Sequence, residues 1–174
     1  MIALWALGGF YLSLGPLLAT SIIGSQNLVW GGVVIVLLTG VGSLCSLLSR
    51  NSAPASAVLW GALALLTGVA VTVAGIEAPS GALFLLGTAI AGVGFGIGFL
   101  GGFRILSALA PPTERARLVA TIYVVCYLSF SLPAIVAGVV VTRSGLHHAS
   151  LGYAAFVGVL SAIAAADVDA FLRA

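Results

Sequence analysis

The chain has 174 residues, of which 61% are hydrophobic and 6% are charged, and its formal net charge is +2. A soluble domain typically carries about 25% charged residues, so this chain has too few charges to cover a water-facing surface. The small net charge and the lack of a basic run also exclude nucleic acid as a partner. With a mean hydropathy of +1.28, the composition predicts that lipid is the main solvent.

Apolar runs, each close to the length of about 20 residues that crosses a bilayer, follow one another along the chain. Short polar stretches separate them, for example Ser25-Gln26-Asn27 after the first run. The runs are continuous and rich in Leu, Ala, Val and Gly, which favours helices over the short alternating strands of a barrel. We predict an all-α membrane protein, a single six-helix transmembrane domain over 1–174, with spans at about 2–23, 28–48, 57–76, 81–109, 118–141 and 150–166.

The arginines are divided unevenly between the two sides of the predicted membrane domain. One side receives all of them except Arg143, namely Arg50, Arg104, Arg115, Arg117 and Arg173. Because cytoplasmic loops carry the excess of basic residues, we expect a multi-pass plasma-membrane protein with both termini in the cytoplasm. Two helix triplets are compatible with an inverted repeat, since the second and fifth predicted spans each precede an arginine and small polar residues.

The fourth predicted span carries two periodic rows of side chains. Gly94, Gly98 and Gly102 recur every four residues on one face, where small residues let a neighbouring backbone approach closely. Helix packing is the simpler explanation, and space for a solute path is the alternative. Phe95 and Phe99 begin an aromatic stripe with the same interval, which faces either lipid or a cavity for an apolar solute.

Charged residues follow near the end of the same span. Arg104 lies more than one turn inside the apolar run, so it faces either a wet interior or, by snorkelling, the nearby interface. Glu114, Arg115 and Arg117 begin the next loop, where Glu114 can pair with Arg117 or with Arg104. These loop charges are either solvated surface groups or a cytoplasmic gate whose ion pairs change between conformations.

Prolines interrupt two predicted helices, at Pro16 and Pro133. Proline frees a backbone carbonyl and bends a helix, which suits the moving helices and binding sites of transporters. Each proline follows a stretch of tyrosine and serine that supplies Tyr11 and Ser13 in the first case and Tyr127 in the second. These hydroxyls are candidate polar contacts in a cavity.

Chemistry-bearing side chains are sparse inside the predicted spans. No aspartate or glutamate lies in the middle of a span, so a proton-coupling carboxylate is missing from this sequence. His147 and His148 are adjacent in a predicted loop without a neighbouring carboxylate, which argues against a metal site. Catalytic motifs of membrane proteases and the Walker loop are also missing. We predict neither an enzyme nor a cofactor.

The sequence resembles the C-terminal six-helix half of a major facilitator superfamily transporter, notably of actinobacterial efflux-type members. The most specific segments are 8–16 (GGFYLSLGP) and 92–145, which contains GVGFGIGFLGGFR, APPTERAR and YVVCYLSFSLPAIVAG. The resemblance implies two six-helix halves around a cavity with alternating access, lined here by the first and fourth helices. It implicates as cavity or gate candidates Tyr11, Ser13, Phe95, Phe99 and Arg104.

The resemblance covers nearly the whole chain but only half of such a transporter. The first apolar run begins at Ile2 without flanking charge, which we interpret as entry into the middle of a longer protein. We therefore expect efflux-type secondary transport of a small solute, with a second six-helix half or self-association completing the pathway in the bilayer. The alternative is a non-transporting membrane assembly or interaction protein, or a truncated remnant.

Overall fold

The computed structural model describes residues 1–25, 27–111 and 113–173, and side chains up to Ala170. Gln26, Pro112, Ala174 and the Arg173 side chain, on which part of the predicted orientation rests, lie outside this description. The all-α prediction is confirmed for the described residues. Their elements are α1 (Ile2–Ser13), α2 (Gly15–Ile23), α3 (Val29–Leu48), α4 (Pro54–Glu77), α5 (Gly81–Ala108) and α6 (Arg115–Arg173).

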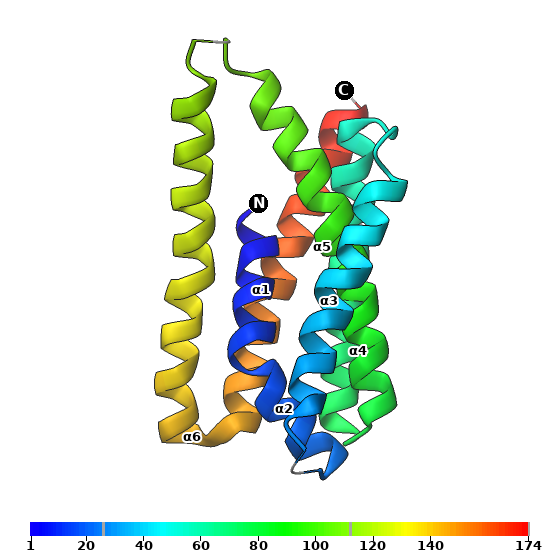
Figure 1. Ribbon diagram of the computed structural model, residues 1–174, viewed down its shortest axis with the longest axis vertical. Coiled ribbons are helices and arrows are strands. Elements are labelled where there is room, and N and C mark those ends of the chain that lie inside the picture. The colour runs from blue at the N-terminus through cyan, green and yellow to red at the C-terminus, as the bar shows by residue number, and fades with distance from the viewer. Residues whose placement is uncertain (26, 112, 174) are drawn as a thin grey trace.

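The long helices stand side by side in one bundle (Figure 1). Within the described residues, α3, α4, α5 and α6 are each long and apolar enough to cross a membrane. α1 and α2 pass the same test together, as a pair bent by 52°. The bend falls at Leu14, just ahead of Pro16, whose missing N–H is tolerated in the first turn of α2. These lengths are compatible with a helical membrane protein.

α6 comprises two helical segments that are joined at a break at Gly145. The predicted spans 118–141 and 150–166 both lie inside it, and the loop expected over 143–149 is wrong, because this stretch is helical except at Gly145. Gly145 has φ 81° and ψ 165°, a conformation that is essentially restricted to glycine. That single residue reverses the chain direction, so the two segments of α6 run oppositely in Figure 1.

Pro133 lies within the first segment of α6 and keeps helical backbone angles. The interruption expected at this proline is therefore absent, and the break comes at Gly145 instead. Ser129 and Ser131 flank the proline on its N-terminal side and donate hydrogen bonds to the carbonyl oxygens of Val125 and Tyr127, one turn back. Their hydroxyls are thus satisfied within the helix.

Glycines on α5 let α4 pack against it backbone to backbone. Gly87, Gly94 and Gly101 recur every seven residues, and a Cβ added to Gly94 would stand 2.5 Å from the backbone nitrogen of Leu65. A Cβ added to Gly101 would stand 2.7 Å from the carbonyl oxygen of Pro54. Real Cβ atoms do not approach backbone atoms this closely, so any larger residue here would push the two helices apart.

α4 supplies the matching row, Gly61, Gly68 and Gly75, with the same interval. A Cβ added to Gly75 would stand 2.5 Å from the backbone nitrogen of Phe84 on α5. A seven-residue interval keeps a row on one face because two helical turns contain about 7.2 residues. We call the two rows together the glycine seam.

The four-residue row predicted on α5 winds around the helix instead of facing one neighbour. Gly94 packs on α4, whereas a Cβ added to Gly98 would lie 3.2 Å from Leu4 and one on Gly102 would lie 3.1 Å from Met1. Four residues advance a helix by slightly more than one turn, so each step rotates the row by about 40°. All three glycines are packing positions, but the first contacts α4 and the last contacts the chain just before α1.

The two ends of the bundle carry different parts of the chain. Figure 1 shows both termini, the connection after α3 and the connection after α5 toward one end, which we call the termini end. The connections after α2 and α4 and the break at Gly145 lie at the other end, which we call the Gly145 end.

Candidate functional site

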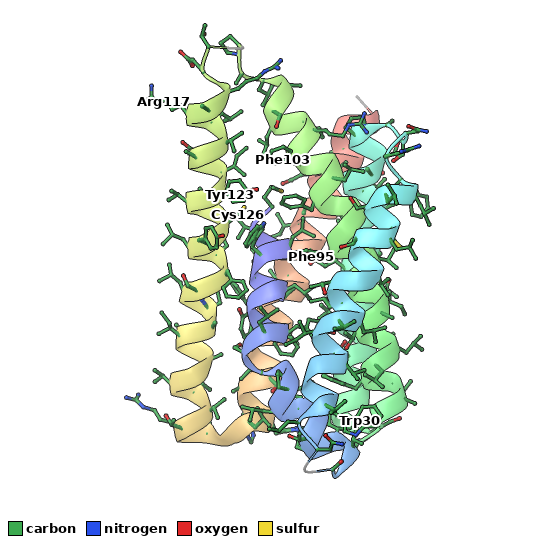
Figure 2. All side chains as sticks on the ribbon, viewed as in Figure 1. Trp30, Phe95, Phe103, Arg117, Tyr123 and Cys126 are labelled. Atoms are coloured by element: carbon green, nitrogen blue, oxygen red, sulfur yellow. The ribbon has the colours of Figure 1, made fainter. Side chains whose placement is uncertain are left out.

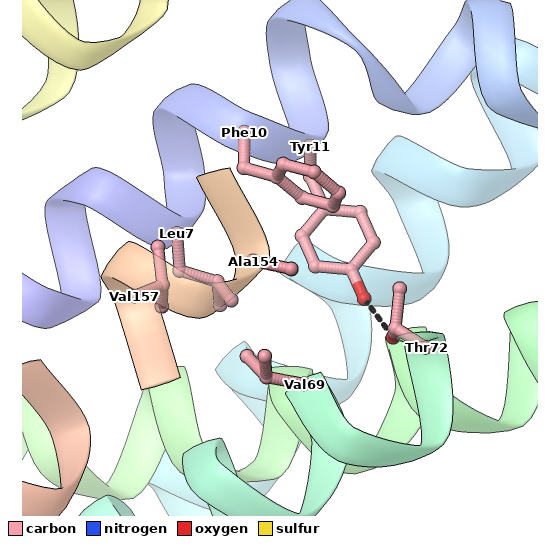
Figure 3. Close-up of a pocket in the computed structure, with 7 residues that line it drawn as sticks. All are labelled: Leu7, Phe10, Tyr11, Val69, Thr72, Ala154 and Val157. Atoms are coloured by element: carbon pink, nitrogen blue, oxygen red, sulfur yellow. Dashed lines mark hydrogen bonds between the residues drawn. The ribbon is translucent and has the colours of Figure 1, made fainter. Parts of the chain in front are cut away.

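Tyr11 lies in the packed interior of the bundle (Figure 3). Its side chain is fully buried, and its hydroxyl forms a 2.7 Å hydrogen bond with Oγ1 of Thr72 on α4. The space beside this pair, bounded by Leu7, Val69 and Val157, leaves no room for a water molecule. In this conformation Tyr11 therefore links α1 to α4 through its hydrogen bond. It does not face a cavity large enough for a solute, which is the role predicted from the sequence.

Ser13 is separated from Tyr11 although both were predicted to serve one cavity. Ser13 is exposed, and its hydroxyl donates a 2.6 Å hydrogen bond to the carbonyl oxygen of Gly9 in the preceding turn. A bond of this kind satisfies the hydroxyl within its own helix. The structure therefore does not bring the two residues into one polar site.

Aromatic side chains from α1, α5 and the first segment of α6 meet around Trp5. The centroid of its ring lies 5.4 Å from that of Tyr127 and 6.4 Å from those of Phe99 and Tyr123. Phe103 stacks on Phe99 with centroids 5.8 Å apart. Such separations are typical of attractive aromatic pairs. We call these five residues the aromatic cluster, and Figure 2 shows Phe103 and Tyr123 between α5 and the first segment of α6.

Trp5, which lies at the centre of the aromatic cluster, was not among the candidate residues predicted from the sequence. Its Nε1 is buried and has no hydrogen-bond acceptor among the described residues. A buried indole N–H usually finds a partner, so an unused donor lies at the centre of the cluster. The available signal was a tryptophan three residues before Gly8, which places both residues on one face of α1.

Phe95 lies next to the aromatic cluster, where Gly8 leaves room on α1. A Cβ added to Gly8 would stand 3.6 Å from the ring of Phe130 and 3.8 Å from that of Phe95. Figure 2 places Phe95 on the side of α5 that faces α1. Of the six predicted cavity residues, the structure thus gathers Phe95, Phe99 and Tyr127 on one side of the bundle.

The α6 side of the aromatic cluster is poorly covered by the rest of the chain. Tyr123 is 40% exposed and Tyr127 is 60% exposed, although both contact Trp5. Leu128 on the same segment is 50% exposed. Apolar side chains exposed in this way are available to lipid, to a solute or to another protein.

A cavity of about 280 Å³ lies where α5 passes into α6 at the termini end. Glu114 and Arg117 both line it, together with Leu109 and Thr121. Within the described part of the chain, Glu114 lies within ion-pair distance of neither Arg117 nor Arg104. Arg115 is exposed beside them. The predicted gate charges are therefore close together, but without an ion pair in this conformation.

Arg104 is directed to a loop instead. Its Nη1 donates hydrogen bonds to the carbonyl oxygens of Arg50, at 3.2 Å, and Ser52, at 3.0 Å. Both acceptors belong to the connection between α3 and α4, and the guanidinium is exposed. The side chain thus reaches the termini end, as the snorkelling alternative described, and holds this loop against α5.

At the Gly145 end, Nε2 of His147 lies 3.3 Å from Oε1 of Glu77. The prediction that no carboxylate lies near the histidines is wrong. The fold brings Glu77, the last residue of α4, to the break in α6. His148 donates a 3.1 Å hydrogen bond from Nδ1 to the carbonyl oxygen of Ser144. A search of the described residues finds no group of three or more metal-ligating side chains.

No protein family, curated protein or solved structure matches this chain. The class that the fold itself defines is an all-helical bundle with several long apolar helices, compatible with a membrane location.

Proposed function

We propose that the chain is half of a secondary transporter that moves a small solute with an apolar body by alternating access, in the efflux direction. The observation that carries the proposal is the aromatic cluster, with its unused Trp5 Nε1 and two exposed tyrosines. Ligand sites are mostly apolar with a few polar groups that fix orientation, which is the composition found here. The resemblance to the major facilitator superfamily supports the same side of the bundle, since its first and fourth helices line the cavity.

The proposed topology has six crossings. The α1–α2 pair counts as one, α6 crosses once on each side of Gly145, and the three remaining helices cross once each. Two triplets of such crossings form the proposed inverted repeat. At the termini end lie Arg50, Arg104, Arg115 and Arg117, so the positive-inside rule orients this end toward the cytoplasm of the plasma membrane.

Glu114 and Arg117 form the proposed cytoplasmic gate. They line one cavity without an ion pair in this conformation, and the proposal expects a pair to form when the gate closes. A second six-helix half, or a second copy of this chain, covers the aromatic cluster and completes the pathway. In a bilayer without such a partner, lipid would occupy this side.

The deciding experiment is solute flux in proteoliposomes, with ethidium as a probe because its flat aromatic cation stacks on aromatic rings. Replacing Trp5 or Tyr127 by alanine is expected to lower the flux at least tenfold. The matched control is Trp60→Ala on α4, since Trp60 is 65% exposed and, among the described residues, forms no ring contact with the aromatic cluster. Equal flux in all variants would contradict the assignment. Absence of flux in the wild type, alone and with co-reconstituted membrane partners, would favour the non-transporting assembly protein.

A further inference from the structure

A contact between an imidazole and a carboxylate joins two helices at the Gly145 end. Nε2 of His147 lies 3.3 Å from Oε1 of Glu77. Glu77 is the last residue of α4, and His147 lies two residues after Gly145, in the second segment of α6. Both side chains are about half exposed, so water can deliver protons to them and remove protons from them. The contact therefore attaches the second segment of α6 to α4 at the point where the chain reverses.

The imidazole of His147 must carry a hydrogen on Nε2, because a carboxylate accepts hydrogen bonds and donates none. A neutral ring with its hydrogen on Nε2 meets this requirement, and so does the imidazolium with both nitrogens protonated. The imidazolium also places a positive charge opposite the carboxylate, which adds Coulomb attraction to the hydrogen bond. Histidine gains this charge as the pH falls from about 8 to about 5. The contact is therefore expected to strengthen over that range.

The other basic groups near His147 do not provide it with an opposite charge. The ring centroid of His148 lies 5.7 Å from that of His147, and its Nδ1 donates to the carbonyl oxygen of Ser144. Arg143 is exposed at the end of the first segment of α6. The start of α5 and the connections after α2 and α4, which lie at the same end, contain no acidic or basic residue. Arg143 and a protonated His148 would oppose a charge on His147, so Glu77 is the group that favours it.

The segment that this contact attaches is the well-packed part of α6. Val157 and Ser161 of the second segment are fully buried, and a Cβ added to Gly158 would stand 3.9 Å from Val69 on α4. The first segment, in contrast, is largely exposed and leaves the packed part at Gly145. The contact between Glu77 and His147 thus extends the packing of α4 against α6 as far as the break.

We propose that Glu77 and His147 form a pH-sensitive contact, which holds the break in α6 against α4 more firmly in acid than in alkaline solution. Its contribution is present while His147 is protonated and Glu77 is ionised. That contribution decreases as the pH rises through the histidine range, and it is lost again when the pH falls far enough to protonate the carboxylate. The contact depends on the fold and not on transport. With the termini end in the cytoplasm, it responds to the pH outside the cell.

A double-mutant cycle of chemical unfolding in detergent, at about pH 5.5 and about pH 8, tests the proposal. The variants are Glu77→Gln, His147→Gln and the two together. All of them change half-exposed side chains, and glutamine keeps each position polar. At the lower pH, the coupling between the substitutions is expected to change the unfolding equilibrium constant about two- to fivefold, which is typical of exposed ion pairs. At the higher pH the coupling is expected to be smaller.

His148→Gln is the matched control, because His148 contacts a carbonyl oxygen and not a carboxylate. In this background the coupling between Glu77 and His147 should keep its pH dependence. A coupling that is equal at the two pH values, or larger at the higher one, would overturn the proposal. So would loss of the pH dependence in the His148→Gln background, which would assign the response to His148. Since the cycle needs no solute, its failure is distinct from the absence of flux that would contradict transport.

Discussion

The α4–α5 pair and the first segment of α6 have similarly apolar sequences but opposite packing. Along the glycine seam the two backbones touch, and Gly94, Gly68 and Ala91 are buried. Along the first segment of α6, bulky residues such as Tyr127, Ile135 and Val136 are mostly exposed. That segment approaches the α1 backbone at Gly9, where an added Cβ would stand 2.5 Å from the carbonyl oxygen of Phe130.

The comparison indicates what organises a uniformly apolar chain. Because lipid is as apolar as the helix surfaces, hydrophobicity does not determine which surfaces of the helices pack together. Side-chain size then determines how closely two helices approach. Small residues mark where two helices touch backbone to backbone, and bulky residues mark the surface that the rest of the described chain leaves exposed.

The largest effect is expected in the seam. Gly94→Leu should destabilise the fold by about 3 kcal/mol, because the new side chain overlaps the backbone of α4 at Leu65. Gly138→Leu is the control in the first segment of α6, where an added Cβ meets nothing within 4 Å. It should stabilise that helix by up to about 1 kcal/mol. Chemical unfolding in detergent measures both, and similar destabilisation by the two would contradict the comparison.

The second largest effect on stability is expected at Gly145, where the two segments of α6 join. Gly145→Ala places a Cβ at φ 81°, ψ 165° and should cost about 1–3 kcal/mol. Gly152→Ala, with open space around it and no positive φ, should be neutral or slightly stabilising. Spin-label distances between the two segments of α6 reveal whether the alanine redirects the first segment. An unchanged stability would mean that the break does not depend on glycine.

Tyr11→Phe tests the closed interior next to the seam. Removing the hydroxyl leaves Thr72 Oγ1 without its 2.7 Å partner and should cost about 1–2 kcal/mol. The double variant Tyr11→Phe/Thr72→Val should recover part of that loss, since no unsatisfied hydroxyl then remains. Tyr123→Phe is the control, because Tyr123 is 40% exposed and its hydroxyl forms no hydrogen bond with another described residue. Equal unfolding midpoints for Tyr11→Phe and Tyr123→Phe would rule out a structural role for the bond.

The smallest effect is expected at Arg104. Its two hydrogen bonds to the α3–α4 loop are exposed, so Arg104→Ala should cost about 1 kcal/mol or less. Faster proteolysis of the loop around Ser52 would report its release. We also expect wild-type ethidium flux in this variant, because the Arg104 guanidinium binds the α3–α4 loop and not the aromatic cluster. A large loss of flux in Arg104→Ala would contradict this expectation and indicate that Arg104 takes part in transport.

The sequence was most informative where a local rule decides the structure. Continuous apolar runs predicted where α3, α4 and α5 lie, and the bend between α1 and α2 falls beside Pro16. The prediction of a loop over 143–149, which rested on polar residues, was wrong. These residues are helical except at Gly145, and the chain reverses direction at that glycine. The prediction that Gly94, Gly98 and Gly102 share one face was also wrong. α5 is so rich in glycine that rows with four-residue and seven-residue intervals coexist, and the seven-residue row faces α4.

The candidate site was predictable only in part. The aromatic periodicity of α5 identified Phe95 and Phe99, but nothing local indicates that Trp5 contacts Tyr127, since that pairing depends on where the distant α6 packs. Tyr11 was predicted as a cavity residue because it lies in the stretch before Pro16. Its position around the α1 axis instead directs its hydroxyl to Thr72. Likewise, the contact between His147 and Glu77 joins residues from separate helices.

Quenching of tryptophan fluorescence by ethidium measures whether the solute contacts the aromatic cluster. Phenylalanine keeps an aromatic ring but removes the indole emission, so the loss of signal reports position. We expect Trp5→Phe to abolish the saturable quenching and Trp60→Phe to retain it. Undiminished saturable quenching in Trp5→Phe would contradict the claim.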